Sequence, residues 1–313
     1  MKRSINRFEF YILLESYIED LEFNSPLIEF ILSAPLEKFD EFDIEREREE
    51  LKIVLSGEDL KLFERIVRIL SDPEFEFIIS LRIDKKQFIN KLYERDQLIV
   101  EYLFDAKDQF SLESPLPHDE KLSHYIKLLD ISEYQLDYTQ SQHILSYDEY
   151  VVLNLAFSLE KLSRSIGIVG DDTFIHFDLK DILNEFEERD HEFINDIAVL
   201  FRNEKGARES VDIPAQVDSL IKKEYLKKIN GDSLTIGFKA VMLFENLFMP
   251  ESIHFSYSNK KFINSDEVLF KYGMFQCNRK SSFLLYFENG NVIIKIIPDK
   301  GTFKKVFLKA FDF

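Results

Sequence analysis

The chain has 313 residues, of which 45% are hydrophobic and 31 are phenylalanine, so it can form a sizeable core and is not a disordered chain. Its net charge of −18 is unevenly placed: residues 1–204 hold 46 acidic and 23 basic side chains, and residues 205–313 hold 12 and 17. The single cysteine, Cys277, excludes an internal disulfide framework and a cysteine-rich zinc site, which is typical of a reducing compartment.

The first residues lack the pattern of a secretory signal. Such a signal needs an uncharged apolar stretch of roughly 7–15 residues, and Glu9 and Glu15 interrupt the first apolar segment. Uncharged runs such as 151–157 are too short to cross a bilayer. We therefore expect a cytoplasmic protein without a membrane span.

The first two-thirds of the chain is predicted to be mainly helical. Apolar residues recur at helical spacing in five stretches: 10–21, 60–70, 88–103, 150–162 and 179–201. Ser146 and Glu149 form a capping box that predicts a helix start. The weak alternation over 75–81 indicates a strand, and the two prolines within 111–118 indicate a linker.

The last sixty residues have the alternation of β-strands. Asn289 and Gly290 predict a tight hairpin turn, because both tolerate positive φ. The alternation predicts an antiparallel meander of about five strands, over 253–257, 268–272, 283–287, 292–296 and 306–310. No sequence repeat with a fixed period is present.

Together these patterns predict an α+β fold. We expect a largely helical N-terminal two-thirds, a helix–hairpin–helix segment near 212–248, and an antiparallel β meander at the C-terminus. The predicted domains are an acidic helical region at 1–110, a helical region with one short strand at 118–204, and a mildly basic α+β domain at 205–313.

The segment 212–248 has the most specific order of elements. Asp212 can cap a helix that has Pro214 in its first turn, two short strands flank the turn at Asn230 and Gly231, and a second helix follows. This order resembles the closing part of winged-helix domains. The family commonly has a glycine before the first wing strand, where this chain has Glu224.

The winged-helix resemblance implies either DNA binding or protein docking. Lysines supply nonspecific DNA affinity by neutralising phosphates. The available ones are Lys222, Lys223, Lys227 and Lys228. Acidic neighbours balance them, and the first helix has no arginine for bidentate contact with guanine. The simpler interpretation is that these lysines lie on a solvated surface without a nucleic-acid partner.

One acidic segment contains a histidine. In a strand, Asp172, His176 and Asp178 would project to one side, and such a group can hold a metal or tune a general base. The alternative, which we favour, is that Asp178 caps the helix that follows. Cys277 has basic neighbours that would activate a thiol, but a buried structural cysteine is the more common case.

No phosphate-binding loop, dinucleotide fingerprint or metalloprotease spacing is present, so we expect no cofactor. The leading hypothesis is a non-enzymatic protein-interaction or regulatory adaptor with a protein partner. It would act through the acidic helical body and the β-rich C-terminal domain. The alternatives are a winged-helix nucleic-acid-binding regulator and a metal-dependent hydrolase centred on His176. The sequence does not indicate an oligomeric state.

Overall fold

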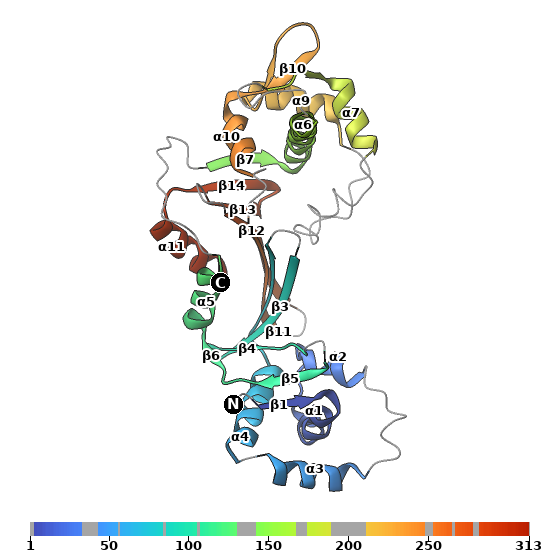
Figure 1. The fold of residues 1–313 in the computed structure, drawn as a ribbon, viewed down its shortest axis with the longest axis vertical. Helices are drawn as coiled ribbons and strands as arrows, with labels where there is room; N and C mark the ends of the chain where they lie inside the picture. Colours follow the sequence, from blue (N-terminus) through green and yellow to red (C-terminus); the bar gives the residue numbers. More distant parts are fainter. Residues whose placement is uncertain are drawn as a thin grey trace.

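The molecule is elongated, and a large sheet joins two helical lobes at its opposite ends (Figure 1). It is known from a computed structural model. The described residues are 3–32, 43–55, 57–83, 86–104, 107–129, 142–166, 174–188, 211–247, 253–264, 267–277 and 282–312.

The sheet has nine strands in the order β6-β4-β3-β2-β11-β12-β13-β14-β7, and every neighbouring pair is antiparallel. The strands are β2 (Phe75–Ile83), β3 (Lys86–Arg95), β4 (Leu98–Glu101), β6 (Leu116–Pro117), β7 (Gln142–Ser146), β11 (Ile253–Asn264), β12 (Glu267–Cys277), β13 (Ser282–Glu288) and β14 (Asn291–Ile297). At its centre, β2 pairs with β11, from Phe75 opposite Lys261 to Arg82 opposite His254.

The N-terminal lobe packs around Phe10, whose ring lies 4.9 to 5.5 Å from those of Phe30, Phe63, Phe104 and Phe110. Its elements are β1 (Arg3–Asn6), α1 (Arg7–Leu14), the 3-10 helix η1 (Glu15–Asp20), α2 (Pro26–Leu32), α3 (Ile44–Val54), α4 (Gly57–Ser71) and β5 (Gln109–Leu112). The strands β1 and β5 pair with each other as a separate sheet.

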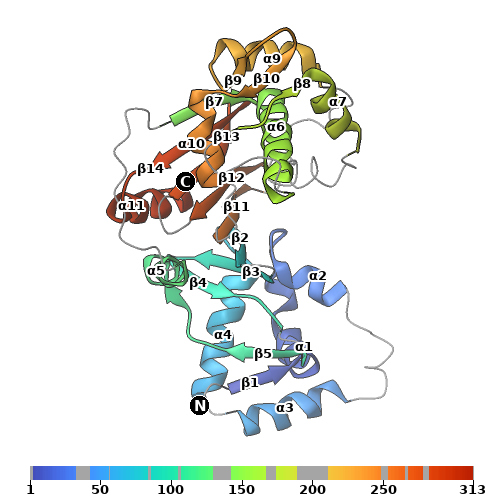
Figure 2. The same ribbon diagram turned by 45° about the horizontal axis from the view of Figure 1, so that its top comes forward.

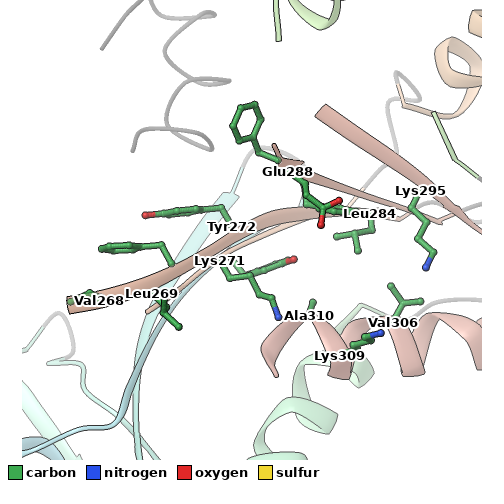
Figure 3. Close-up of a pocket in the computed structure, with 14 residues that line it drawn as sticks. Val268, Leu269, Lys271, Tyr272, Leu284, Glu288, Lys295, Val306, Lys309 and Ala310 are labelled. Atoms are coloured by element: carbon green, nitrogen blue, oxygen red, sulfur yellow. The ribbon is translucent and has the colours of Figure 1, made fainter. Parts of the chain in front are cut away.

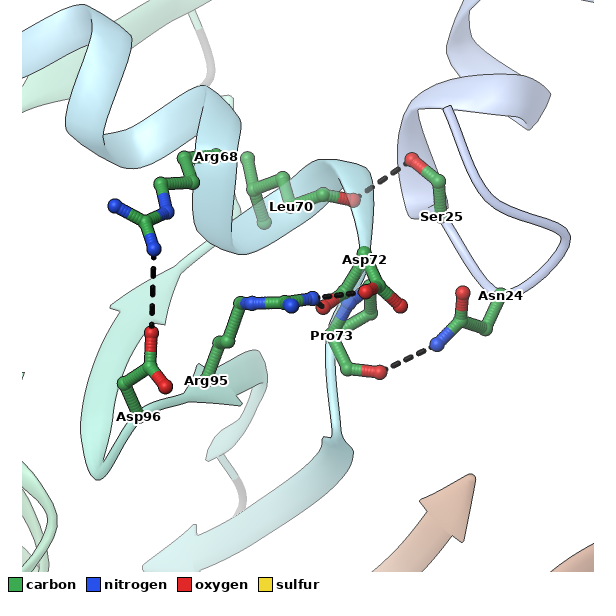
Figure 4. A network of polar contacts seen from close by, with 8 residues as sticks. All are labelled: Asn24, Ser25, Arg68, Leu70, Asp72, Pro73, Arg95 and Asp96. Carbon is green, nitrogen blue, oxygen red and sulfur yellow. Dashed lines mark hydrogen bonds and ion pairs between the residues drawn. The ribbon is translucent and has the colours of Figure 1, made fainter. Parts of the chain in front are cut away.

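Polar contacts fasten this lobe to the central sheet where α4 gives way to β2 (Figure 4). Arg95, at the end of β3, donates to the carboxylate and the backbone carbonyl of Asp72. Ser25 Oγ donates to the Leu70 carbonyl at 2.7 Å, and Asn24 donates to the Pro73 carbonyl. The Leu70 carbonyl lies in the last turn of α4, where it has no partner within the helix, and Asp72 and Pro73 are the two residues that follow.

The described residues of the C-terminal lobe form four helices and a small sheet of order β8-β10-β9. Its elements are α6 (Tyr147–Ser165), β8 (Phe177–Asp178), α7 (Leu179–Glu188), α9 (Ile213–Lys222), β9 (Leu226–Lys228), β10 (Ser233–Ile236) and α10 (Phe238–Leu247). The predicted capping box at Ser146 and Glu149 is confirmed. Glu149 is also buried against α9, where it accepts hydrogen bonds from Ser219 Oγ at 2.5 Å and Lys223 Nζ at 2.7 Å.

Two further helices, α5 (His118–Leu128) and α11 (Lys300–Phe311), lie on the same face of the central sheet (Figure 1). The layer between them and the sheet is a third core, distinct from those of the two lobes. It contains Phe77 of β2, Phe255 of β11 and Phe275 of β12, all fully buried.

The two halves of the fold repeat one topology. Each begins with a strand that leads through a capping box into a helix, at Asn6 and Glu9 in the first half and at Ser146 and Glu149 in the second. Each then forms an antiparallel meander, β2-β3-β4 or β11-β12-β13, and ends in a helix on the third core. The pairing of β2 with β11 joins the halves.

The predicted distribution of helices and strands was wrong. Strands β1 to β7 lie within the first half of the chain, and helices α9, α10 and α11 lie in the last third. Residues 88–103, predicted to be helical, form β3 and β4. Their tight turn at Asp96 and Gln97 has φ of 53° and 62°, the positive values that a two-residue hairpin requires.

The predicted fifth strand at 306–310 is part of α11 instead. Asp299 caps that helix, because its Oδ1 accepts a hydrogen bond from the Thr302 N–H at 2.8 Å. Phe303, Phe307 and Phe311 then recur four residues apart, so all three side chains reach the same core. The apolar residues of 303–311 fit both the alternation of a strand and the spacing of a helix. The cap at Asp299 favours the helix.

The segment 212–248 has the predicted order of helix, strand, strand and helix over its described residues. β10 also pairs with β8, so the hairpin is part of a three-stranded sheet. Glu224, at the position where winged-helix domains commonly have glycine, has φ of 66°. The predicted fold class, of which the winged-helix-like segment is a part, is incorrect as a whole.

The predicted division into domains stays a prediction. The nine-stranded sheet takes β2, β3 and β4 from the region 1–110, β7 from the region 118–204, and β11 to β14 from the region 205–313. None of the helices in the described part of the chain combines the length and hydropathy needed to traverse a bilayer.

Replacing Gly237 by alanine is expected to destabilise the protein by about 2–3 kcal/mol. A Cβ at Gly237 would lie 2.4 Å from the backbone oxygen of Glu224, which the strained turn holds in place. Chemical denaturation measures the change. Gly57→Ala is the control, because no atom lies within 4 Å of a Cβ there. Equal stabilities for Gly237→Ala and the parent chain would contradict this view of the turn.

Candidate functional site

Helix α11 forms one wall of the candidate site, and its aromatic side chains fix its position. The Phe307 ring lies 5.0 Å from the rings of both Phe255 and Phe275, and Phe303 lies 5.3 Å from Phe275. Burying each such ring stabilises a fold by about 1.5–3 kcal/mol relative to leaving it exposed. The helix is therefore a firm part of the third core.

Two polar contacts hold the C-terminal end of α11 against the sheet. Asn259 Nδ2, buried on β11, donates to the Ala310 carbonyl at 3.0 Å. Lys271 Nζ, on β12, donates to the Asp312 carbonyl. Carbonyls in the last turn of a helix have no partner within it, so both bonds stabilise this end.

A groove of about 670 Å³ lies between β12, β13 and α11 (Figure 3). Its inner part is lined by Tyr257, Leu284 and Tyr286 from the sheet, together with Val306 from the helix. At its outer end, Leu269 and Phe270 are 46% and 43% exposed. The groove therefore offers apolar surface that no described part of the chain buries fully.

Close packing shapes the inner part of the groove. The Tyr257 hydroxyl lies over Gly273, and a Cβ at Gly273 would be 2.5 Å from it. Burial raises the pKa of Tyr257, so its hydroxyl stays protonated. Burial, followed by the charge of Glu288, also raises the pKa of Tyr286. Both tyrosines can act as hydrogen-bond donors at neutral pH.

Cations collect in this groove although the whole chain carries −18. Lys271, Lys295 and Lys309 extend their amino groups to the side of the sheet that faces α11, and Glu288 is the acidic residue of the lining (Figure 3). Burial, partly offset by Asp312, lowers the pKa of Lys271. Within the described ranges, Lys295 and Lys309 form no ion pair.

The four lysines proposed for nucleic-acid binding are all exposed, and two of them lie beside carboxylates. Lys223 is paired with the buried Glu149 at 2.7 Å, and Lys228 lies 3.7 Å from Asp232. Lys222 at the end of α9 and Lys227 on β9 are exposed. The use of these lysines for nucleic-acid binding stays a prediction.

Of the three residues proposed as a metal site, the structure describes His176 and Asp178. Asp178 accepts a hydrogen bond from the Asp181 N–H at 3.0 Å, as expected for a helix cap, while His176 is exposed. Asp172 lies outside the described residues. No cluster of three or more His, Cys, Asp or Glu suited to a metal ion is present in the described ranges. Cys277 is buried in β12 as predicted, and burial raises its pKa to about 12.

Buried polar pairs between distant segments were missed by the sequence reasoning. His118 Nδ1 lies 2.5 Å from Glu94 Oε2 across α5 and β3. Burial opposes protonation of His118, but Glu94 outweighs it, and the pKa is raised. His143 Nδ1 lies 2.8 Å from the hydroxyl of Tyr225, linking β7 to the residue that precedes β9. No local spacing signals either contact, because the partners are 24 and 82 residues apart.

Comparisons with known proteins do not assign a family. Neither the models of protein families nor the curated proteins gave a match. Among solved structures, the chain is similar to the type VII secretion system chaperone EspG5 of Mycobacterium tuberculosis, solved in complex with a PE25–PPE41 dimer. The identity is 10%, the match covers 99% of this chain and 95% of that chain, and the TM-score is 0.47. Because this score lies below 0.5, we base no functional conclusion on it.

The stability of the protein is expected to fall between about pH 6.5 and pH 4 through His143. Burial, assisted by the charge of Lys239, lowers its pKa to about 4 from 6.5. The unfolded chain therefore binds a proton in this range that the folded chain does not, which favours unfolding as the pH falls. Above pH 6.5 the effect vanishes. Denaturation of the parent and of His143→Phe across this range measures it, and parallel curves would contradict it.

Proposed function

We propose that this protein is a non-enzymatic adaptor that binds an acidic segment of a protein partner in the groove beside α11. The observation that carries the proposal is the group of three lysines in one apolar groove of a chain with a net charge of −18. An acidic segment would find compensating charge there, whereas the net charge of −18 on the whole chain repels it. Such complementarity selects both the partner and the place of binding.

Apolar contacts would supply most of the affinity. Removing apolar surface from water favours association by about 25 cal/mol per Å², and partly exposed Leu269, on the face of β12 toward α11, and Phe270, on the opposite face, provide such surface. Exposed ion pairs contribute only about 0.2–1 kcal/mol each. The lysines would therefore decide which segments bind, and the aromatic and aliphatic lining would decide how tightly.

A displayed library of random peptides, sorted against the full chain, tests the proposal. We expect enrichment of peptides in which acidic and apolar residues are combined. The double variant Lys295→Glu/Lys309→Glu is expected to weaken binding of the recovered peptides by at least about tenfold, because attraction becomes repulsion at two positions.

Lys304→Glu is the matched control. It makes the same charge change on an exposed side chain of α11 outside the groove, and is expected to leave binding nearly unchanged. Circular dichroism confirms that each variant is folded. Recovery of basic peptides, or equal affinity for the double variant and the parent, would overturn the proposal.

A further inference from the structure

Strand β12 extends past the end of its neighbour β13. On one side, β12 pairs with β11 along nearly its whole length, as far as Glu267 opposite Asn264. On the other side, its pairing with β13 stops at Gly273 opposite Tyr286. The outer edge of residues 267–270 therefore has no paired strand among the described parts of the chain.

This edge lies at the outer end of the lysine-lined groove, because Val268, Leu269 and Phe270 all line it. In an antiparallel strand every second residue directs its backbone N–H and C=O toward the same edge. An uncovered edge of this kind is a template for another strand, and proteins usually block it with charge, proline or a covering element. Within the edge 267–270, Glu267 at the start of the strand is charged, whereas residues 268–270 carry neither charge nor proline.

The first half of the fold has an equivalent uncovered edge on β3. Its charged neighbours differ from those of the edge on β12. Strand β3 likewise extends past β4, whose pairing stops at Leu92 opposite Glu101. There, however, Lys121 on the α5 side donates to Glu101 at 2.7 Å, and the exposed Lys91 of β3 alternates with the buried Leu92 and so lies on the opposite face. Within the described residues, the second edge combines open backbone groups with Lys295 and Lys309, which form no ion pair and line the groove beside α11.

We propose that the acidic partner segment binds as an added strand along residues 267–270 of β12, in line with β13. This inference rests on the proposed function and specifies the binding mode. Side chains of a strand alternate between the two faces of a sheet. One set would enter the groove toward the lysines, and the other would lie on the opposite face beside Phe270 and Tyr272, whose rings stack with centroids 6.0 Å apart.

Binding as an added strand requires a partner segment with acidic side chains at alternate positions and apolar side chains between them. Lys271 shares its face of β12 with Leu269 and points toward α11, whereas Tyr272 points away from it (Figure 3). A helical partner would instead place its acidic residues three or four positions apart. The spacing within peptides recovered from the library therefore distinguishes the two modes.

Backbone N-methylation of one recovered acidic peptide tests the inference. Two isomers are made, with methyl groups on alternate residues of the central segment, in odd or in even positions. An added strand uses only one set of amides to pair with β12. One isomer is expected to lose binding by at least about tenfold, and the other to bind within about threefold of the parent peptide.

Equal losses for both isomers, or no loss for either, would overturn strand addition. If the double lysine variant still weakens binding in that case, the adaptor proposal holds and only strand addition fails. The two failures are therefore distinguishable. Phe270→Ser, at the proposed edge, is expected to weaken binding, whereas Phe88→Ser, a similarly exposed residue on β3, is not. Equal effects of these two variants would also contradict the assigned edge.

Discussion

The pairing of β2 with β11 is the constraint on which the rest of the structure depends. It aligns Phe75–Arg82 with His254–Lys261, segments that are more than 170 residues apart, and thereby joins two meanders into one sheet. The same register places Phe77, Phe255 and Phe275 on one face, where α5 and α11 cover them. This pairing adds β2 and its Phe77 to the third core, beside the strands β11 and β12 on which α11 packs.

The repeated topology also explains why the sheet has uncovered edges. In each half, the hairpin next to the central pair has long strands, whereas the following strand is shorter: β4 has 4 residues beside the 10 of β3, and β13 has 7 beside the 11 of β12. The halves differ in charge at these edges. Glu101 neutralises Lys121 in the first, while the described residues leave Lys295 and Lys309 unpaired in the second.

Much of the local structure was predictable, because the helices 60–70 and 150–162 and the strands of 253–297 carry strong patterns. The errors arose where two patterns overlap. Asp96 and Gln97 make a tight turn without the usual glycine, so β3 and β4 were taken for a helix. Because residues 306–310 are predicted as a strand, the sequence gives no sign of helix α11 or of the groove that it lines. Lys271, Lys295 and Lys309 come from three elements, so no spacing could group them before the fold was known.

Hydrogen exchange in the full chain, measured with and without an acidic peptide recovered from the library, tests the central claim most directly. Strand addition predicts slower exchange of backbone amides within residues 267–270, since backbone groups open at that edge would gain partners. It predicts no change at the equivalent edge, residues 86–90 of β3. Unchanged exchange at 267–270 in the saturated complex, or protection confined to another surface, would contradict the account.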